Sequence, residues 1–353
     1  MLRKRLLVPA LAGALLLNVC AAIAQTVGPN GESATPSAEV TLSDADISAV
    51  KDKGYKAALL WHTSSDFTNA VTAGAKDEFA RAGMAVTITT DAGFDAARQR
   101  SDIETALAAK PNVILSLPLD PVTSAEAFRQ AVKDGTKLVF LSNLPSGYKH
   151  GTDYAAIVTD DLFQMGKQAA DALAKGIGGK GNVGYIFHDA TYYVPNQRDQ
   201  AFKKTIEKDY PDIKIVAEQG ITDPARAEEL ASAMLVQHPD LDGIYVTWAE
   251  PADGVLSALR SSGNTKTKIV TLDLAEPVAL DMVKGGNVQA LVADKAYELG
   301  RAMAAAGVKA LEGQQTPPFI VAPALTVTKE NVSQGWKDSL NREAPQSVLD
   351  AAK

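Results

Sequence analysis

The chain has 353 residues, a formal net charge of -7 at pH 7 and one cysteine, Cys20. A net negative charge argues against nucleic acid or an anionic membrane surface as a partner, because both repel an acidic protein. A single cysteine rules out a disulfide within the chain and any metal site built from several thiolates. The length suits two domains of ordinary size better than one.

The N-terminus is typical of a secretory signal peptide. A positively charged start is followed by an apolar stretch over 6–22 and by small residues that suit cleavage after Ala24. The sequence therefore predicts a signal peptide over 1–24 and a mature protein outside the cytoplasm. A membrane anchor is disfavoured because the apolar run is short and polar sequence follows it at once. Cys20 leaves a lipoprotein as an alternative, although Val19 is a poor residue before a lipidated cysteine.

Residues 25–53 form a separate N-terminal extension. The stretch "QTVGPNGESATPSAEV" is polar and rich in turn-forming residues, which predicts a flexible tether. The next stretch, "TLSDADISAVKDKG", predicts a short helix with Ser43 as its N-cap.

From Tyr55 onward, short apolar runs alternate with longer segments of helical period. This alternation predicts parallel sheets with helices on both faces, that is, an α/β fold with two doubly wound domains. The irregular stretch 143–154 separates the first set of units from the second. The predicted strands cover 57–61, 85–89, 113–117, 138–141, 183–187, 213–217, 243–247, 269–272 and 288–292. The predicted helices cover 69–82, 98–109, 124–134, 163–175, 198–209, 224–237, 252–261 and 295–312.

The sequence holds no convincing catalytic or cofactor motif. Residues 176–181 match the GxGxxG dinucleotide pattern, but a helix is expected before them and a strand after them, the reverse of what the motif needs. We expect these glycines to end a helix. The histidines show no metal-ligand spacing, and neither a Walker motif nor a GxSxG turn is present. The sequence thus predicts a protein that is not an enzyme and needs no metal or cofactor.

Aromatic and acidic side chains gather at the ends of the predicted strands, where ligands of open α/β sheets bind. Planar rings offer an apolar face to C–H groups, while carboxylates and amides accept hydrogen bonds from hydroxyls. Arg198 is the one arginine among them, whereas a phosphate or sugar-acid site would need more cationic groups. The pattern therefore indicates a sugar or polyol site. The candidate ligand-binding residues are Trp61, His62, Ser65, Asp66, Phe67, Asn143, Tyr193, Asn196, Arg198, Trp248, Glu250, Asp273 and Asp294.

The order of several motifs resembles the ribose/galactose type of periplasmic sugar-binding protein, the soluble component of ABC sugar importers. The resemblance covers about residues 55–328. It rests on "AVTAGAKDEFARAGMAV", "RQRSDIETALAAKPNVILSLPLDP", "NQRDQAFKKTI", "QHPDLDGIYVTWAEPADGVLSAL" and "IVTLDLAEPVALDMVKGGNVQALVADKAYELG".

The resemblance implies the type I periplasmic binding protein fold, in which two similar α/β lobes are joined by a three-crossover hinge. The N-terminal lobe would then comprise 54–157 and 295–322, and the C-terminal lobe and tail would comprise 158–294 and 323–353. A family aspartate that contacts the ligand corresponds to Asp273, and the glutamine at the family's hinge corresponds to Asp294.

Two positions depart from the family pattern. An Asp-Arg pair of the family corresponds to Ser142-Asn143, and an Asn-Asp pair corresponds to Trp248-Ala249. These departures favour a ligand other than ribose but keep aromatic walls and acidic acceptors. Such a site suits a neutral sugar, a sugar alcohol, or an amino sugar whose ammonium group pairs with Asp273 or Asp294.

The resemblance also implies a mechanism and a partner. A monomer in the periplasm would capture a monosaccharide or sugar alcohol between its closing lobes and deliver it to the permease of an ABC transporter in the inner membrane. Two alternatives remain at this stage. The protein could report its ligand to a receptor kinase, or it could be a secreted carbohydrate-active hydrolase with two carboxylates as acid and nucleophile or base.

Overall fold

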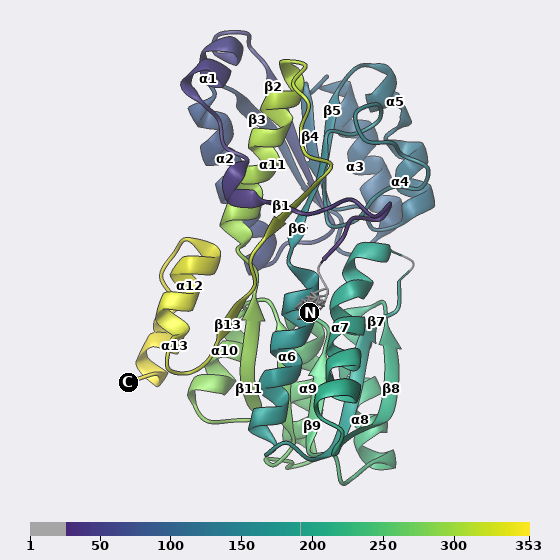
Figure 1. Ribbon diagram of the computed structural model, residues 1–353, viewed down its shortest axis with the longest axis vertical. Coiled ribbons are helices and arrows are strands. Elements are labelled where there is room, and N and C mark those ends of the chain that lie inside the picture. Colours follow the sequence, from purple (N-terminus) through teal and green to yellow (C-terminus); the bar gives the residue numbers. More distant parts are fainter. Residues whose placement is uncertain (1–25, 191) are drawn as a thin grey trace, which may run out of the picture.

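The computed structural model describes residues 26–190 and 192–353, which fold into two lobes stacked along the long axis of the molecule (Figure 1). The signal peptide predicted over 1–24 lies outside these residues. Each lobe is a mostly parallel sheet with helices on both faces, so the predicted α/β fold of two doubly wound domains is confirmed. No helix in the described part of the chain has the length and apolar character needed to cross a membrane.

The first lobe holds a seven-stranded sheet in the order β1-β12-β6-β5-β4-β2-β3, and the second holds a six-stranded sheet in the order β13-β11-β10-β9-β7-β8. All neighbouring strands are parallel except β11 and β13. The strands of the first sheet are β1 (Thr35–Pro36), β2 (Lys56–Trp61), β3 (Ala85–Asp91), β4 (Val113–Ser116), β5 (Lys137–Leu141), β6 (Ala156–Asp160) and β12 (Phe319–Ala322). Those of the second are β7 (Gly181–His188), β8 (Ile213–Ile221), β9 (Gly243–Val246), β10 (Lys268–Leu272), β11 (Val288–Ala293) and β13 (Leu325–Val327).

Helices cover both faces of each sheet, which explains why the central strands are apolar throughout rather than alternating. On β2, Leu59 packs toward α2 and α11, while its neighbour Leu60 packs toward α3, α4 and α5. In the second lobe α8, α9 and α10 pack on one face, and α6 and α7 pack on the other. The helices of the first lobe are α1 (Asp44–Val50), α2 (Asp66–Arg81), α3 (Ala96–Ala108), α4 (Pro121–Ala127), α5 (Arg129–Lys133), α11 (Ala296–Leu311) and the short 3-10 helix η1 (Ser37–Glu39). The others are α6 (Leu162–Gly176), α7 (Tyr193–Asp209), η2 (Pro224–Arg226), α8 (Ala227–Gln237), α9 (Ala249–Ser261), α10 (Glu276–Val283), α12 (Val332–Leu340) and α13 (Gln346–Ala351).

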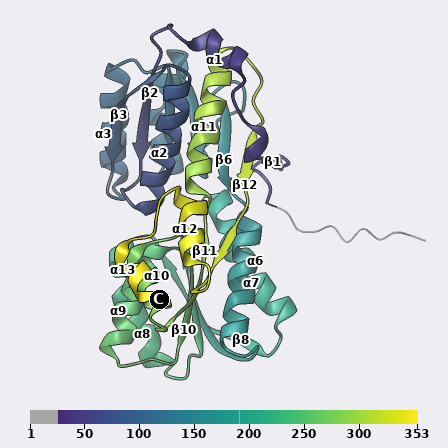
Figure 2. The same ribbon diagram turned by 90° about the vertical axis from the view of Figure 1, so that its left-hand side faces the viewer.

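Apart from the N-terminal extension, the chain passes between the lobes at three places. β6 of the first sheet leads to α6, β11 of the second sheet leads to α11, and β12 of the first sheet leads to β13 of the second. The first and third crossings are adjacent, because the backbone N–H of Asp161 donates to the carbonyl of Ala322 at 2.7 Å. These are the three crossovers of the predicted hinge, and Figure 2 shows them grouped between the lobes.

β6 is a strand that the periodicity did not predict. It is short, and it follows the irregular stretch 143–154, yet all five of its residues are buried. The lobe boundary expected between residues 157 and 158 falls inside this strand, which pairs along its length with β5 and β12 of the first sheet. We therefore propose a first lobe of 54–160 and 295–322, and a second lobe of 161–294 with the tail 323–353.

Residues 26–50 pack against both lobes, so the flexible tether expected at the start of the extension is wrong. On the second lobe, Thr26 Oγ1 donates to Asp161 and accepts from the N–H of Phe163. The backbone N–H of Val27 donates to the side-chain oxygen of Gln197, and the side-chain amide of Gln197 donates to the carbonyl of Val27. On the first lobe, β1 joins the edge of the sheet beside β12. The polar composition that suggested a tether instead supplies the hydrogen bonds of this attachment.

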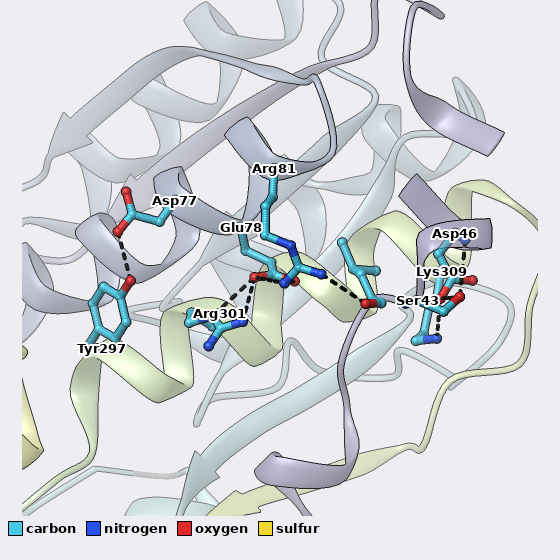
Figure 3. Close-up of polar contacts among 9 residues, drawn as sticks. Ser43, Asp46, Asp77, Glu78, Arg81, Tyr297, Arg301 and Lys309 are labelled. Carbon is cyan, nitrogen blue, oxygen red and sulfur yellow. Dashed lines mark hydrogen bonds and ion pairs between the residues drawn. The ribbon is translucent and has the colours of Figure 1, made fainter. Parts of the chain in front are cut away.

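The short helix predicted in the extension is α1, and Ser43 is its N-cap as expected. The side chain of Ser43 accepts from the N–H of Asp46, and Asp46 accepts from the N–H of Ser43 in return. Asp46 also receives a hydrogen bond from Lys309 at 3.0 Å (Figure 3) and another from Gln314 at 2.6 Å. These contacts tie the extension to α11 in the first lobe.

Helices α2 and α11 cross at unusually short distance because each has a glycine at the contact. A Cβ atom built on Gly74 would lie 2.0 Å from the carbonyl oxygen of Tyr297, and one on Gly300 would lie 2.0 Å from that of Val71. Glu78, 1% exposed, lies beside the crossing and pairs with Arg301 of α11 at 2.9 Å (Figure 3). The crossing therefore depends on the absence of two side chains and on an ion pair between the helices in which the carboxylate is buried and the arginine is partly exposed.

Gly74→Ala should lower the free energy of unfolding by about 1–3 kcal/mol, since the new methyl group meets backbone that cannot move aside without separating the helices. The midpoint of urea unfolding measures the effect. Asn69→Ala, on the exposed side of the same helix, is the matched control and should change the free energy by less than about 0.5 kcal/mol. Equal stability of the two variants would show that the crossing is not tight.

Candidate functional site

A cavity of about 290 Å³ lies between the two lobes, where the carboxyl ends of both sets of parallel strands face each other. The segments at or after the ends of β2 to β11 all contribute to its wall. The first lobe supplies His62, Ser65, Phe67, Phe94, Ala96, Leu117, Leu119, Ser142, Asn143 and Asp160. The second lobe and the hinge supply Leu162, His188, Ala190, Tyr192, Arg198, Thr222, Trp248, Glu250, Asp273 and Asp294. A ligand here would contact both lobes at once.

Most of the residues expected from the sequence meet in this cavity. The ones that line it are His62, Ser65, Phe67, Asn143, Arg198, Trp248, Glu250, Asp273 and Asp294. They come from positions spread over more than two hundred residues of chain, and the carboxyl-end rule for parallel strands brings them together.

Two expected residues have other partners. Trp61 is 3% exposed and donates its indole N–H to Thr72 at 2.7 Å, so it belongs to the core beneath α2. Asp66 is the first residue of α2 and pairs with Arg342 of the C-terminal tail. Trp61 is the last residue of β2 and still packs in the sheet. Asp66 is the first residue of α2, and its side chain turns toward the C-terminal tail.

A third expected residue, Asn196, is not among those that line the cavity. Asn196 donates its side-chain amide to the carbonyl of Ala190 at 2.8 Å and so holds the loop before α7. Tyr193 begins α7, and its side chain lies outside the part of the chain that the structure describes.

An aromatic row crosses the cavity from one lobe to the other. The rings of Phe94 and Trp248 stack with centroids 6.4 Å apart, His62 meets Phe94 edge-on at 5.2 Å, and His188 meets Trp248 edge-on at 5.0 Å. Phe94 follows β3 of the first lobe, whereas Trp248 follows β9 of the second. This row gives the site flat apolar surfaces of the kind that suit the C–H face of a sugar.

Arg198 enters the cavity from α7 and is held by buried polar groups. Its Nη2 donates to Thr247 at 3.2 Å, and its Nε lies 3.8 Å from Asp199 Oδ1. Asp199 in turn accepts from the hydroxyls of Tyr245 and Thr247 and from the N–H of His188. The carboxylate of Asp199 therefore matches the charge of Arg198 and fixes its position.

The close approach of helices α6 and α7 fixes the position of the Arg198 backbone. A Cβ atom on Gly166 of α6 would lie 2.0 Å from the carbonyl oxygen of Arg198 and 2.7 Å from the N–H nitrogen of Phe202. Only a glycine at position 166 lets the first turns of α7 pack so close to α6.

Three carboxyl groups form a contact row at the hinge. Asp160 is the last residue of β6, Asp294 follows β11, and Asp273 follows β10. The side chain of Asp294 is within hydrogen-bonding contact of both Asp160 and Asp273. Burial raises the pKa of Asp160 to about 7, and burial together with the neighbouring carboxylates raises the pKa of Asp273 and Asp294 well above the ordinary range. The row thus holds its protons to a higher pH than isolated carboxyls do.

The remaining titratable side chains of the cavity are shifted by burial too. Burial raises the pKa of Glu250 to about 7, with Asp273 adding to the effect. Burial lowers the pKa of both His62 and His188 to about 4, so both imidazoles are neutral at neutral pH. The wall consequently presents mainly neutral hydrogen-bonding groups around the Arg198–Asp199 pair.

Backbone strain is concentrated at the cavity. Phe94, Ser142 and Asp273 all line it, and each has a positive φ, between 56° and 66°. Such a φ is uncommon for residues other than glycine, and it costs free energy that the surrounding structure must offset. In each case the turn directs a side chain or an adjacent amide toward the space between the lobes.

The sequence prediction missed Phe94, Asp160, His188 and Tyr192 as wall residues. Phe94 stands in "DAGFD" after β3, and Asp160 ends the strand that the periodicity passed over. Both are found by the rule that selected the others, once every strand end is included. His188 and Tyr192 belong to the segment after β7, where polar residues are too dense for sequence alone to select those that face inward.

The described residues offer no metal or dinucleotide site. No group of three or more histidine, cysteine, aspartate or glutamate side chains in residues 26–190 and 192–353 is placed to hold a metal ion. The GxGxxG match ends a helix, as predicted from the order of elements: α6 ends at Gly176, and β7 begins at Gly181.

A model of the periplasmic binding protein domain family matches residues 57–315. The chain belongs to this family. Membership, predicted from the order of the motifs, is thus confirmed, and the family is one of binding proteins. The extension that precedes residue 57, including the segment attached to both lobes, lies outside the match.

Individual relatives and solved structures agree with this membership. The xylitol-binding protein of Mycolicibacterium smegmatis is 26% identical over 279 residues, which cover 76% of this chain and 77% of that protein. The ribose import binding protein of Bacillus subtilis is 24% identical over 258 residues, which cover 73% and 81%. The crystal structure of an ABC transporter solute-binding protein from Agrobacterium vitis, bound with α-D-tagatopyranose, matches with a TM-score of 0.74 at 22% identity and covers 82% of this chain and 100% of that one. At this identity the structural match establishes the fold.

The stability of the empty protein should fall as the pH rises, and Asp160→Asn should reduce that dependence. The folded protein holds the proton of Asp160 up to about pH 7, whereas the unfolded chain loses it near the ordinary value of 3.8. Between these values the folded state binds more protons, so its free energy of unfolding decreases with pH, by up to about 1.4 kcal/mol per unit for one proton. Urea unfolding over this pH range measures the slope. A variant with the same slope as the parent would contradict the assignment, and Asp189→Asn, an exposed neighbour of the site, is the control.

Proposed function

We propose that this protein captures a monosaccharide or sugar alcohol in the periplasm, between two closing lobes, and delivers it to the permease of an ABC transporter. It acts as a monomer and performs no chemistry on its ligand. The observation that carries the proposal is the cavity between the lobes, in which an aromatic row and a set of hydrogen-bonding groups face the same space.

The size of the cavity favours a small ligand. Its volume of about 290 Å³ lies near the lower end of the range for ligand sites, about 300–1,000 Å³. A single sugar ring or a short polyol suits this space, whereas an oligosaccharide does not. The wall surrounds the ligand from both lobes, so its contacts favour the closed arrangement over an open one.

The chemistry of the wall favours hydroxyl groups. Asn143 Oδ1, Tyr192 Oη and Arg198 Nε are buried and have no hydrogen-bond partner among the described residues. Together they offer an acceptor, a hydroxyl that can donate or accept, and a donor. Ligand hydroxyls can pair with all three, because each hydroxyl both donates and accepts.

The named ligands of similar proteins support the class. Relatives are described as binding xylitol, ribose and D-allose, and solved neighbours contain tagatopyranose, D-arabinose, D-fucose and allitol. These are all monosaccharides or sugar alcohols. Several come from importers, which supports delivery to a transporter rather than to a receptor kinase.

The arrangement of the carboxyls disfavours the hydrolase. A glycosidase places two carboxyls on opposite sides of the scissile bond, about 5–10 Å apart. Here Asp160, Asp273 and Asp294 contact one another in one row at the hinge. The row by itself does not supply such a separated pair.

A thermal-shift screen of the mature protein, stripped of carried-over ligand by unfolding and refolding, tests the function. The panel holds pentoses, hexoses, alditols, amino sugars, sugar acids and amino acids. A ligand at about 100 times its Kd adds roughly 2.7 kcal/mol to the free energy of unfolding, which gives a clear shift. We expect a shift with at least one sugar, amino sugar or alditol. Shifts with acids or amino acids alone, or with nothing, would contradict the proposal.

Gly166→Ala should weaken binding of the ligand found in that screen by about tenfold or more, because the added methyl group displaces the backbone that holds Arg198. Gly74→Ala is the matched control, since its Cβ makes an equally short contact at a helix crossing away from the cavity. Calorimetric titration of both variants should show weaker binding for the first and nearly unchanged binding for the second. A parallel loss in both would assign the effect to stability alone.

A further inference from the structure

Carboxyl groups outnumber lysine and arginine side chains in the wall of the cavity. Asp160, Glu250, Asp273 and Asp294 line it, and Arg198 is the one lysine or arginine among the lining residues. Asp160 and Asp294 are 3% and 4% exposed, so water cannot solvate them as it would on a surface.

Arg198 offsets these carboxyls only in part, because it already has an acidic partner. Asp199 pairs with it and is itself saturated by Tyr245, Thr247 and a backbone N–H. Lys295, which directly follows Asp294 in the chain, has its Nζ 3.9 Å from Glu298 instead. In the described part of the chain no lysine or arginine forms an ion pair with Asp160, Asp273 or Asp294. The charge of the row must therefore be balanced by protons or by the ligand.

The row also contains an acceptor that the protein leaves unused. Asp160 Oδ1 is buried and has no hydrogen-bond donor among the described residues, and the same is true of Asn143 Oδ1 across the cavity wall. Both atoms can only accept, unless the carboxyl is protonated. They need donors from the molecule that enters the cavity.

A neutral ligand does not explain why this row is made of carboxyls. A carboxylate accepts hydrogen bonds from hydroxyls more strongly than asparagine or glutamine does, but a neutral ligand does not compensate the charge of three carboxyls buried next to one another. Because burial and the neighbouring carboxyls raise their pKa, the three carboxyls lower the stability of the empty protein progressively as the pH rises above the ordinary carboxyl pKa of the unfolded chain. That cost has a use if the ligand brings a positive charge, since an ammonium group offers three donors and balances the row.

We propose that the ligand carries a protonated amino group among its hydroxyls, as in an amino sugar or an amino polyol, and that Asp160, Asp273 and Asp294 bind this group. The inference rests on the proposed function, because it narrows the ligand class of the same cavity. The aromatic row of Phe94 and Trp248 contacts the carbon skeleton, and the ammonium group lies at the hinge. Binding then replaces protons in the row by the charge of the ligand.

Matched pairs of ligands that differ by one group test the inference. Glucosamine is compared with glucose, galactosamine with galactose, and 1-amino-1-deoxysorbitol with sorbitol, each by calorimetric titration at neutral pH. We expect the amino member of at least one pair to bind about tenfold or more tighter than its hydroxyl counterpart. The heat of binding should also differ between buffers of different ionisation enthalpy, because protons leave the row as the ammonium group enters.

Three variants separate the role of charge from that of shape. Asp160→Asn and Asp294→Asn keep the size of each side chain but remove the possibility of a negative charge. Each should weaken binding of the amino ligand by about tenfold or more and should raise the midpoint of thermal unfolding of the empty protein. Asp189→Asn, exposed and outside the cavity wall, should change neither.

The outcomes distinguish this inference from the proposed function. Preference for the amino member, lost in both hinge variants, supports the inference. Binding of a neutral sugar or alditol as tight as that of its amino counterpart, and retained in the variants, overturns the inference and leaves the proposed function in place. Absence of binding for all pairs and for the wider panel of sugars and alditols overturns both.

Discussion

The buried ion pair between Arg198 and Asp199 joins the core of the second lobe to the cavity. Asp199 accepts from Tyr245, whose ring stacks on Phe202 with centroids 4.1 Å apart in the core between the sheet and α7. Arg198, the preceding residue, turns its guanidinium toward the space between the lobes. A charged group can be held rigidly there because its partner is anchored in packed hydrocarbon and fully hydrogen-bonded. This pair affects the charge balance of the rest of the site, because Arg198 is the one arginine in the cavity wall and it is already paired with Asp199.

The hinge is both a mechanical and a chemical element of this protein. Asp160 immediately precedes one crossing between the lobes, and Asp294 immediately precedes another. A ligand that contacts these carboxyls therefore acts on the segments whose backbone must turn when the lobes open or close. In the proposed binding cycle, ligand contacts and lobe closure are coupled through short stretches of chain rather than through long pathways.

Sequence alone predicted the fold class and nine of the twenty residues that line the cavity, because one physical rule governs both. Parallel strands buried on two faces are apolar throughout, which makes them visible, and their carboxyl ends then mark where ligand contacts come from. The rule failed where the local signal was weak. β6 follows an irregular stretch and was passed over, and with it Asp160 and the position of the first crossing. The helix at 44–50 was predicted correctly because a capping box is a local signal.

Other errors arose because the end of a strand shows which residues lie near the cavity but not which way their side chains point. Trp61 and His62 are neighbours, yet the first packs beneath α2 and the second faces the cavity. Asp66 lies one residue after Ser65, but it turns to Arg342 of the tail while Ser65 caps α2 at the cavity wall. The polar extension was assigned to a tether because its hydrogen-bonding partners, Asp161 and Gln197, lie more than one hundred residues away. Pairings at that separation have no local signature.

That extension constrains the site from outside. Gln197 holds both backbone groups of Val27 on the outer side of α7, and the next residue, Arg198, lies in the cavity. Gly166 brings the same turn against α6 from a third direction. The first turns of α7 are thus fixed by the extension, by a neighbouring helix and by the Asp199 network at once. Since the guanidinium must keep its place while the lobes move, this triple attachment makes α7 part of a rigid lobe. The conformational change is left to the crossings at Asp160, Asp294 and Ala322 and to the segment of the extension between Val27 and β1.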